Sequence, residues 1–417
     1  MELKRVVVTG IGALTPIGNN VPDYWNALLS GVSGADFIKS FDTTKFKTKF
    51  ACEIKNFSAE VVFGKKEVRK MDPFVHYAMV ATDEAVKDSN LDFPNLDTNR
   101  IGVIWGAGIG GLKTFLDEVS AFAKGDGTPR YNPYFIPKMI LDIAPGHISI
   151  KYGLRGPNFS TVSACASGTN ALIDSFNYIR LGTADVIISG GSEAIINEAG
   201  MGGFNAMHAL STRNDDPKTA SRPFDKDRDG FVAGEGSGAL ILESLEHAKA
   251  RGAKIYAEMI GGGMSADANH ITAPHPEGLG ARLVMTNALR DAQLNTADID
   301  YINVHGTSTP LGDISESKAI VSLFGEDAYK LNISSTKSMT GHLLGAAGAI
   351  EAIASVLAIK NDIVPPTINH FTDDPEFDPQ LNFTFNQPQK RLVRTAMSNT
   401  FGFGGHNASV IFKKYEE

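Results

Sequence analysis

The stretch CASGTNALIDSFNYIRLGTADVIISGG (residues 165–191) contains a pattern that returns once later in the chain. It can be laid on GAAGAIEAIASVLAIKNDIVPPTINH (residues 345–370), because both run from small residues through an apolar helical segment and a turn into a second β-like run. The β-like openings VVVTGIG (6–12) and AEMIGGG (257–263) precede them in the same order. This recurrence predicts two related halves around one core.

The chain as a whole alternates short β-branched runs that end in glycine with longer amphipathic stretches, which is typical of an α/β fold with parallel or mixed sheets. Strands are predicted at residues 5–12, 100–108, 159–164, 185–191, 254–263, 301–306, 331–337 and 408–414. Helices are predicted at residues 22–30, 72–89, 137–150, 167–181, 279–292, 313–324 and 344–360. The predicted halves are residues 1–255 and 256–417.

The composition is that of a globular protein and excludes several classes. Of 417 residues, 42% are hydrophobic and 21% are charged. Glycine (42) is enriched while proline (19) is not, so we expect glycines at tight turns and close backbone approaches. The net charge of −8 argues against general binding to nucleic acid or to an anionic membrane. We find no leader-like start and no window near 18 uninterrupted apolar residues, so we expect a cytoplasmic location and no membrane span.

The chain has two cysteines, Cys52 and Cys165, which excludes a disulfide framework or a cysteine metal site and favours a reducing compartment. Cys165 lies among small residues where a β-like run meets a helical segment. The N-terminus of a helix favours a thiolate, so Cys165 is a candidate nucleophile. The alternative for a free cysteine is a small buried hydrophobic side chain, which is what we expect for Cys52.

Two histidines occupy similar junctions. His305 ends a predicted strand in YINVHGTSTPLGD, and His342 follows Lys337 in SSTKSMTGHLLGAAG. Asp313 and Glu316 are predicted to form a capping box at the start of the next helix, which would hold the His305 loop at the end of its strand. Ligand sites of α/β sheets gather there. A structural role remains the alternative for each histidine taken alone.

One thiol and two histidines, without an evident carboxylate behind either, suit carbon–carbon bond formation through an acyl-cysteine and a carbanion. A Cys-His hydrolase needs one histidine as base and usually a third group to orient it. A second, neutral histidine is better used as an N–H donor to an oxyanion or enolate. The run FGFGG (401–405) offers backbone N–H groups to an oxyanion, with Phe403 as a gate; a flexible turn is the alternative.

These motifs resemble those of the β-ketoacyl-[acyl-carrier-protein] synthases of the thiolase superfamily. The resemblance covers nearly the whole chain, because VSACASGTNA, NVHGTSTPLGD, TKSMTGHLLGAAG and FGFGGHN match in order and spacing, as does the long segment 209–238. It implies a thiolase-like five-layered αβαβα fold from two duplicated halves, and a homodimer. It also implies elongation of an acyl chain by two carbons in type II fatty acid biosynthesis.

The resemblance assigns a role to each candidate catalytic residue. Cys165 would carry the acyl chain, and His305 and His342 would donate hydrogen bonds to the malonyl thioester oxygen during a decarboxylative Claisen condensation. Lys337 would support the His342 region electrostatically. The backbone N–H groups of Cys165 and Phe403 would form the oxyanion hole. No cofactor is implied, because acyl and malonyl groups arrive on the phosphopantetheine of acyl carrier protein.

Further residues match positions that bind substrate or an ion in the family. The acyl-pocket positions are Ile109 and Phe204. The positions along the pantetheine channel and gate are Thr272, Thr307, Thr309 and Gly404. A structural Na⁺ or K⁺ is implied for the oxygen-rich group Asn303, Glu351, Ser398 and Asn399, for which ordinary buried hydrogen bonds are the alternative.

An acidic carrier protein would be repelled on average by a net charge of −8, so its docking requires a local basic face. The candidate residues are Lys65, Lys66, Arg69, Lys70 and Arg130; a solvated, charged helix start is the alternative. Two positions depart from the family pattern. His208 stands where relatives often have arginine, and His406 stands where many have threonine.

Several other functions remain open. A polyketide-type ketosynthase would use the same chemistry. A non-catalytic chain-length partner would not need Cys165. A thiolase would use a second active-site cysteine, and Cys52 lies in no comparable motif. A Cys-His hydrolase would release free fatty acid.

Overall fold

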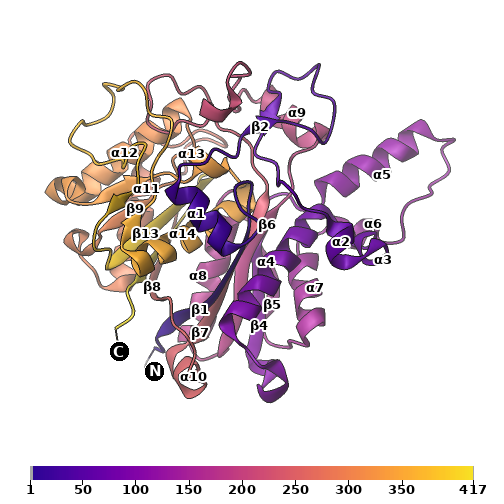
Figure 1. Ribbon diagram of the computed structural model, residues 1–417, viewed down its shortest axis with the longest axis horizontal. Helices are drawn as coiled ribbons and strands as arrows, with labels where there is room; N and C mark the ends of the chain where they lie inside the picture. Colours follow the sequence, from indigo (N-terminus) through magenta and orange to yellow (C-terminus); the bar gives the residue numbers. More distant parts are fainter. Residues whose placement is uncertain (1–2, 417) are drawn as a thin grey trace.

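A computed structural model describes residues 3–416, which contain one ten-stranded sheet with helices on its faces (Figure 1). The strand order is β10-β9-β13-β14-β8-β1-β7-β6-β4-β5. The bounds of these strands are β1 Val6–Leu14, β4 Ile101–Gly106, β5 Asn158–Thr161, β6 Val186–Glu193, β7 Gly236–Ser244, β8 Ala257–Ala266, β9 Tyr301–Asn303, β10 Asn332–Ser334, β13 Thr395–Gly402 and β14 His406–Lys413. Two short ribbons pair β2 (Asp36–Phe37) with β3 (Phe50–Ala51) and β11 (Ile363–Val364) with β12 (Gln389–Lys390).

The helices lie between the strands in sequence and against them in space. Their bounds are α1 Val21–Leu29, α2 Ala59–Phe63, α3 Lys65–Val68, α4 Pro73–Ser89, α5 Leu112–Lys124, α6 Phe135–Met139, α7 Ile143–Tyr152, α8 Ser167–Arg180, α9 Glu198–Ala206, α10 Leu245–Ala250, α11 Leu279–Ala292, α12 Pro310–Phe324, α13 Lys337–Thr340 and α14 Ala347–Asn361.

The sheet is symmetrical about the pairing of β1 with β8. On one side the order outward is β1, β7, β6, β4, β5, and on the other it is β8, β14, β13, β9, β10. On each side the three outermost strands are parallel to one another, and the remaining pairings are antiparallel. The two halves of the sheet therefore repeat one topology.

The hydrophobic cores give this arrangement five layers. The central helices α8 and α14 share one core with strands from both halves of the sheet. Helices α4 and α7 cover the opposite face of the first five strands, and α11 and α12 cover that of the second five. The predicted αβαβα fold is confirmed.

The opening repeat corresponds to the two central helices, because α8 begins at Ser167 and α14 at Ala347, in the same order as the aligned segments. Residues Leu344–Asn361 are long and apolar enough to cross a membrane by length and composition. However, 89% of this window is buried inside the protein, as in the core helix of a globular domain. The repeat also predicted that the β-like run after α14 would join the main sheet, and this is wrong. That run contains β11, which lies in a separate two-stranded ribbon, and β13 occupies the position in the second half that β6 occupies in the first.

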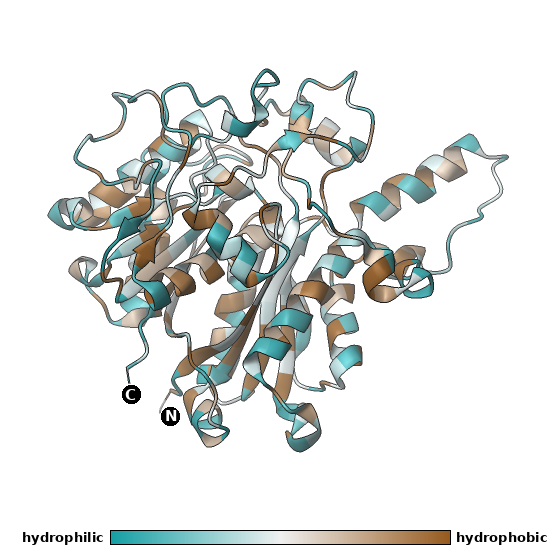
Figure 2. Cartoon of the chain, viewed as in Figure 1, coloured by the Kyte–Doolittle hydropathy of each residue, from teal (hydrophilic) through white to brown (hydrophobic). Residues whose placement is uncertain are grey.

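The other sequence predictions hold for most long elements and fail at several others. The helix predicted at 279–292 has the same bounds in the structure, whereas the one predicted at 137–150 is two helices, α6 and α7. Strands β7 and β13 and helices α5 and α9 were not predicted. Helix α5 projects as an arm from the body (Figure 1), and hydrophilic and hydrophobic residues alternate along it (Figure 2).

Candidate active site

Cys165 lies on a tight bend between β5 and α8. The preceding residue, Ala164, has a left-handed backbone (φ 52°), and Ser163 forms an isolated bridge with Cys165. Gly402, at the end of β13, approaches this bend so closely that a Cβ on it would lie 2.6 Å from the Ser163 carbonyl oxygen and 3.1 Å from the Cys165 nitrogen. The bend presents the thiol at the centre of the molecule, where Cys165 is 6% exposed.

Both predicted histidines converge on this thiol. His342 Nε2 lies 3.0 Å from Cys165 Sγ. The rings of His305 and His342 are 5.1 Å apart and nearly perpendicular, at 89°. The Nδ1 atoms of both rings are buried without a hydrogen-bond partner among the described residues, so no carboxylate orients either imidazole there. This arrangement lacks the third member of a Cys-His hydrolase triad.

The electrostatics of the site favour neutral groups. Burial raises the pKa of the Cys165 thiol to about 12, although the Lys337 charge and the backbone N–H of Phe403 oppose this rise. Burial therefore opposes the thiolate that the helix N-terminus favours. Burial lowers the pKa of both His305 and His342 well below the usual value, and Lys337 lowers both further. Neutral imidazoles accept a thiol proton or donate N–H groups as the reaction requires.

Lys337, at the start of α13, is 1% exposed and paired with Glu351 of α14. Burial raises the pKa of the Glu351 carboxyl, and the Lys337 charge opposes that rise. The ammonium group therefore lies in the core beside a carboxylate and acts on the two histidines through its charge.

Glu316, in α12, holds the His305 loop through hydrogen bonds to its backbone. The backbone N–H groups of His305 and Gly306 each donate to a Glu316 carboxylate oxygen at 2.9 Å. The predicted capping box is wrong, because α12 begins earlier, with Thr309 as its N-cap, and Asp313 and Glu316 lie inside the helix. The sequence spacing gave no sign of this role for Glu316, since a buried acceptor has no periodic signature.

The FGFGG segment is the turn between β13 and β14, with left-handed backbones at Gly404 (φ 87°) and Gly405 (φ 73°). The backbone N–H of Phe403 hydrogen-bonds to the Cys165 thiol. Gly404 donates its N–H to the carbonyl of Ile271 at 2.7 Å. The segment is thus both a hairpin turn and a supplier of a backbone donor at the nucleophile.

Two cavities meet at Cys165. The first, of about 760 Å³, is lined by both histidines, Phe403 and the predicted channel residues Thr272, Thr307 and Thr309. The second, of about 410 Å³, is lined almost wholly by apolar side chains, including the predicted Ile109 and Phe204. Gly404 lines neither cavity. Cys52 also lines neither, and packs in a separate hydrophobic cluster, as its sequence context predicts.

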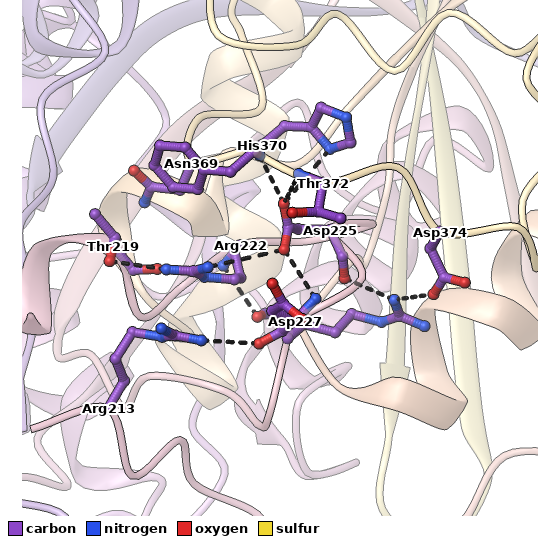
Figure 3. Close-up of polar contacts among 12 residues, drawn as sticks. Arg213, Thr219, Arg222, Asp225, Asp227, Asn369, His370, Thr372 and Asp374 are labelled. Atoms are coloured by element: carbon purple, nitrogen blue, oxygen red, sulfur yellow. Dashed lines mark hydrogen bonds and ion pairs between the residues drawn. The ribbon is translucent and has the colours of Figure 1, made fainter.

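A polar network around Asp225 joins the segment 213–228 to the segment 369–374 (Figure 3). Asp225 accepts backbone N–H groups of Phe371 (2.6 Å) and Thr372 (2.8 Å), and Arg228 donates to Asp374 at 2.6 Å. These contacts fix the segment that leads to Phe231, whose ring packs edge-on against His342 at 5.4 Å. The segment falls within the long match at 209–238, but its roles were not predicted.

The predicted cation residues include Glu351, the partner of Lys337, and the paired strand residues Asn303 and Ser398, and they contain several unpaired buried atoms. Both amide atoms of Asn303, the Ser398 hydroxyl and Glu351 Oε2 have no hydrogen-bond partner among the described residues. Asn399, by contrast, is hydrogen-bonded to Ser409 at 2.8 Å. Unpaired buried oxygens fit an oxygen-liganded monovalent cation, so the donor set is compatible with one.

The predicted basic patch lies on α3 and just after it. Lys65, Lys66 and Arg69 are exposed, whereas Lys70 is partly covered and paired with Glu67 at 2.8 Å. Arg130 is exposed in the loop after α5, 3.6 Å from Asp126. His208 and His406 are both exposed, and His208 lines the larger cavity.

Comparisons with known proteins find similarity along nearly the whole chain. Residues 3–248 match the model of the beta-ketoacyl synthase N-terminal domain, and residues 256–371 match that of the C-terminal domain. The chain is 52% identical over 414 residues, 99% of either chain, to 3-oxoacyl-[acyl-carrier-protein] synthase 2 of Staphylococcus aureus strain N315. It is 50% identical to the protein of that name from Synechocystis, covering 100% of this chain and 99% of the relative.

Solved structures with the same fold include the ishigamide ketosynthase/chain length factor, at TM-score 0.92 and 35% identity, and a beta-ketoacyl synthase from Burkholderia phymatum, at 0.91 and 34%. A type II polyketide ketosynthase bound to its acyl-carrier protein matches at TM-score 0.89 and 34% identity. Each comparison covers 99% of this chain and 100% of the other.

Proposed function

This chain belongs to the beta-ketoacyl synthase family, and on that premise we propose that it catalyses decarboxylative Claisen condensation of malonyl carrier protein with an acyl chain on Cys165. It is an acyltransferase of fatty acid synthesis that extends the chain by two carbons. The observation that carries the site assignment is the 3.0 Å contact between Cys165 Sγ and His342 Nε2 at the junction of the two cavities.

In the first half-reaction the Cys165 sulfur attacks the acyl thioester carbonyl while its proton passes to His342 Nε2. A local base is required, because the thiol pKa is about 12. The backbone N–H groups of Cys165 and Phe403 stabilise the tetrahedral oxyanion. The carbon–sulfur bond to phosphopantetheine then breaks, and the departing thiolate takes the proton from His342.

In the second half-reaction the malonyl thioester occupies the larger cavity beside both histidines. N–H groups of His305 and His342 donate to the thioester oxygen as the carbon–carbon bond to the carboxylate breaks and CO₂ leaves. The enolate carbon attacks the acyl-Cys165 carbonyl. The carbon–sulfur bond to Cys165 breaks, and the Cys165 thiolate takes a proton from solvent water. Lys337 contributes by keeping both imidazoles neutral and able to donate.

The two cavities suit the two parts of the substrate. The larger cavity would hold the pantetheine arm, whose amides hydrogen-bond to hydroxyls such as Thr307 and Thr309, themselves 2.9 Å apart. The apolar cavity would hold the acyl chain against Ile109 and Phe204. The unpaired oxygens near Asn303 would hold Na⁺ or K⁺, which would brace the strands behind Lys337.

The proposed assembly is a homodimer in the cytoplasm, with each chain organised as halves 1–255 and 256–417. Strand β5 supports the dimer, because it ends the sheet with partly exposed residues, whereas β10 at the other end is buried. Large apolar side chains are exposed near β5, including Val162 (61%) and Ile150 (80%). An uncovered edge strand beside exposed apolar groups is typical of a pairing surface. Sedimentation at micromolar concentration measures the assembly.

We expect the double charge reversal Lys65→Glu/Lys66→Glu to raise the apparent KM for carrier-bound substrates by about tenfold at low salt, because it turns attraction to an acidic partner into repulsion. The turnover number should stay near that of the wild type, since neither residue lines a cavity. Steady-state kinetics at two ionic strengths measure both. The matched control Lys330→Glu, on another surface, should not change KM. An unchanged KM in the double variant at low salt would remove this patch from the proposal.

Two alternatives use the same fold. The type II polyketide ketosynthase matched here is 34% identical to the chain, against 50–52% for the 3-oxoacyl-[acyl-carrier-protein] synthases. A non-catalytic chain-length partner would not require the Cys165–His342 contact. The deciding experiment incubates the protein with acyl and malonyl carrier protein and uses mass spectrometry to detect acyl-Cys165 and a product two carbons longer. Free fatty acid as the product would instead indicate hydrolysis.

A further inference from the structure

Glu193, the last residue of β6, is a buried carboxylate that has no role in the proposed reaction mechanism. Its side chain is 0% exposed, and no lysine, arginine or histidine among residues 3–416 forms an ion pair with it. Such a group is retained at a cost in free energy unless all its acceptor sites are satisfied.

Four backbone N–H groups satisfy Glu193, and they come from two different turns. Oε1 accepts from Ile109 and Gly110, both at 3.1 Å. Oε2 accepts from Gly108 at 2.8 Å and from Gly345 at 3.1 Å. One side chain therefore joins the turn after β4 to the turn before α14.

Both turns have a left-handed residue and are tightly packed, and at Leu344 that backbone is strained. Gly110 (φ 75°) and Leu344 (φ 47°) have left-handed backbones. A Cβ on Gly108 would lie 2.7 Å from Glu193 Oε2 and 3.3 Å from the Ala164 carbonyl oxygen, so the bend carrying the nucleophile rests on the same turn. Left-handed non-glycine residues persist only where surrounding contacts hold them, and the Glu193 bond to the Gly345 N–H is one contact next to Leu344.

The same turns carry two walls of the apolar cavity. Ile109 and Leu344 both line it, and Leu344 follows His342 by two residues and also lines the larger cavity. Glu193 itself lines neither cavity. It is placed to fix the separation of these two walls without touching an acyl chain.

We propose that Glu193 is a positioning residue for acyl-chain selectivity, which sets the shape of the apolar cavity by holding the Ile109 and Leu344 turns together. The proposal rests on the proposed function of that cavity. A long acyl chain contacts the cavity along its length, whereas a short chain fills only the part next to Cys165. Loss of the carboxylate should therefore slow the transfer of long acyl chains more than that of short ones.

Glu193→Gln tests this proposal, because the substitution removes the charge and one acceptor oxygen while the side-chain volume stays nearly the same. A glutamine has one acceptor oxygen, and its NH₂ group must face two backbone N–H donors. At the Oε1 position it breaks the bonds to Ile109 and Gly110, and at the Oε2 position it breaks those to Gly108 and Gly345, which join the two turns. We expect the ratio of kcat/KM for twelve-carbon over four-carbon acyl transfer to Cys165 to fall about tenfold. Mass spectrometry of the acyl-enzyme over time measures both rates.

Glu84→Gln is the matched control. Glu84 also accepts backbone N–H groups from two places, Ala13 and Val21, each at 2.8 Å, but it lines neither cavity. It should keep the chain-length ratio within about twofold of the wild type, because its substitution costs stability without moving a cavity wall. Equal losses for both chain lengths in Glu193→Gln, or no loss, would overturn the proposal.

Two further variants keep the test decisive. If Glu193→Gln does not fold, Glu193→Asp retains the charge but is one methylene too short to reach both turns, and the same fall in the ratio is expected. Combining Glu193→Gln with Ile109→Ala should give less than the sum of the separate effects, since both act on one wall; full additivity would contradict this. Failure of the wild type to form any acyl-Cys165 would instead refute the proposed function.

Discussion

Cys165→Ala should abolish condensation, lowering kcat/KM by about a thousandfold or more, because no other described nucleophile lies within reach of His342. Acyl transfer and chain extension should vanish together. Carbon dioxide release from malonyl carrier protein should persist, however, since His305, His342 and Lys337 are untouched. Labelled malonyl carrier protein, with and without acyl substrate, measures the two activities separately.

The control for this variant is Cys52→Ala, which removes the other thiol. Cys52 is buried in its own hydrophobic cluster, where burial raises its pKa to about 12. Its substitution should lower stability by a kilocalorie or two, on the order of other large-to-small core changes, and leave the rate of condensation unchanged. Chain extension by Cys165→Ala at the wild-type rate would refute the mechanism.

The sequence allowed the core of this site to be predicted because its members lie at ends of elements. Cys165, His305 and His342 each follow a β-like run, and the carboxyl ends of strands gather in one region of an α/β sheet. The repeat likewise predicted the two central helices, since a helix buried on all sides is apolar almost throughout.

The buried acceptors could not be predicted in the same way. Glu193 and Glu316 bind backbone N–H groups of residues far from them in sequence, and no spacing rule reports such contacts. Glu316 was misread as part of a helix cap because its spacing from Asp313 fits that local pattern. The raised pKa of the Cys165 thiol could not be predicted either, because local sequence shows the helix N-terminus but not the depth of burial. Strand β7 was missed because GSGALILES begins with small residues that resemble a turn.

Lys337→Met should lower condensation by about a hundredfold or more, because the Lys337 charge acts on all three groups at the centre of the site. It lowers the pKa of the Cys165 thiol and of both imidazoles. Without it the thiol is harder to ionise, which slows acyl transfer. The histidines are also more easily protonated, which slows the step that needs neutral donors.

The sign of the pH effect follows from these shifts. In the wild type the lowered pKa values keep both histidines neutral far into the acid range. Removing Lys337 raises both pKa values, so protonation begins at a higher pH as the solution is acidified. The acid limb of the kcat/KM profile should therefore move to higher pH in Lys337→Met.

A second variant separates this effect from loss of stability. Lys337→Met alone leaves Glu351 as an unpaired buried carboxylate, at a cost of about 3–5 kcal/mol. Lys337→Met/Glu351→Leu removes both charges, so denaturant unfolding should show much of that stability restored. Its acid limb should nevertheless stay displaced, because the histidines still lack the cation. A double variant with the wild-type pH profile would show that Lys337 serves only to hold the fold and does not tune the histidines.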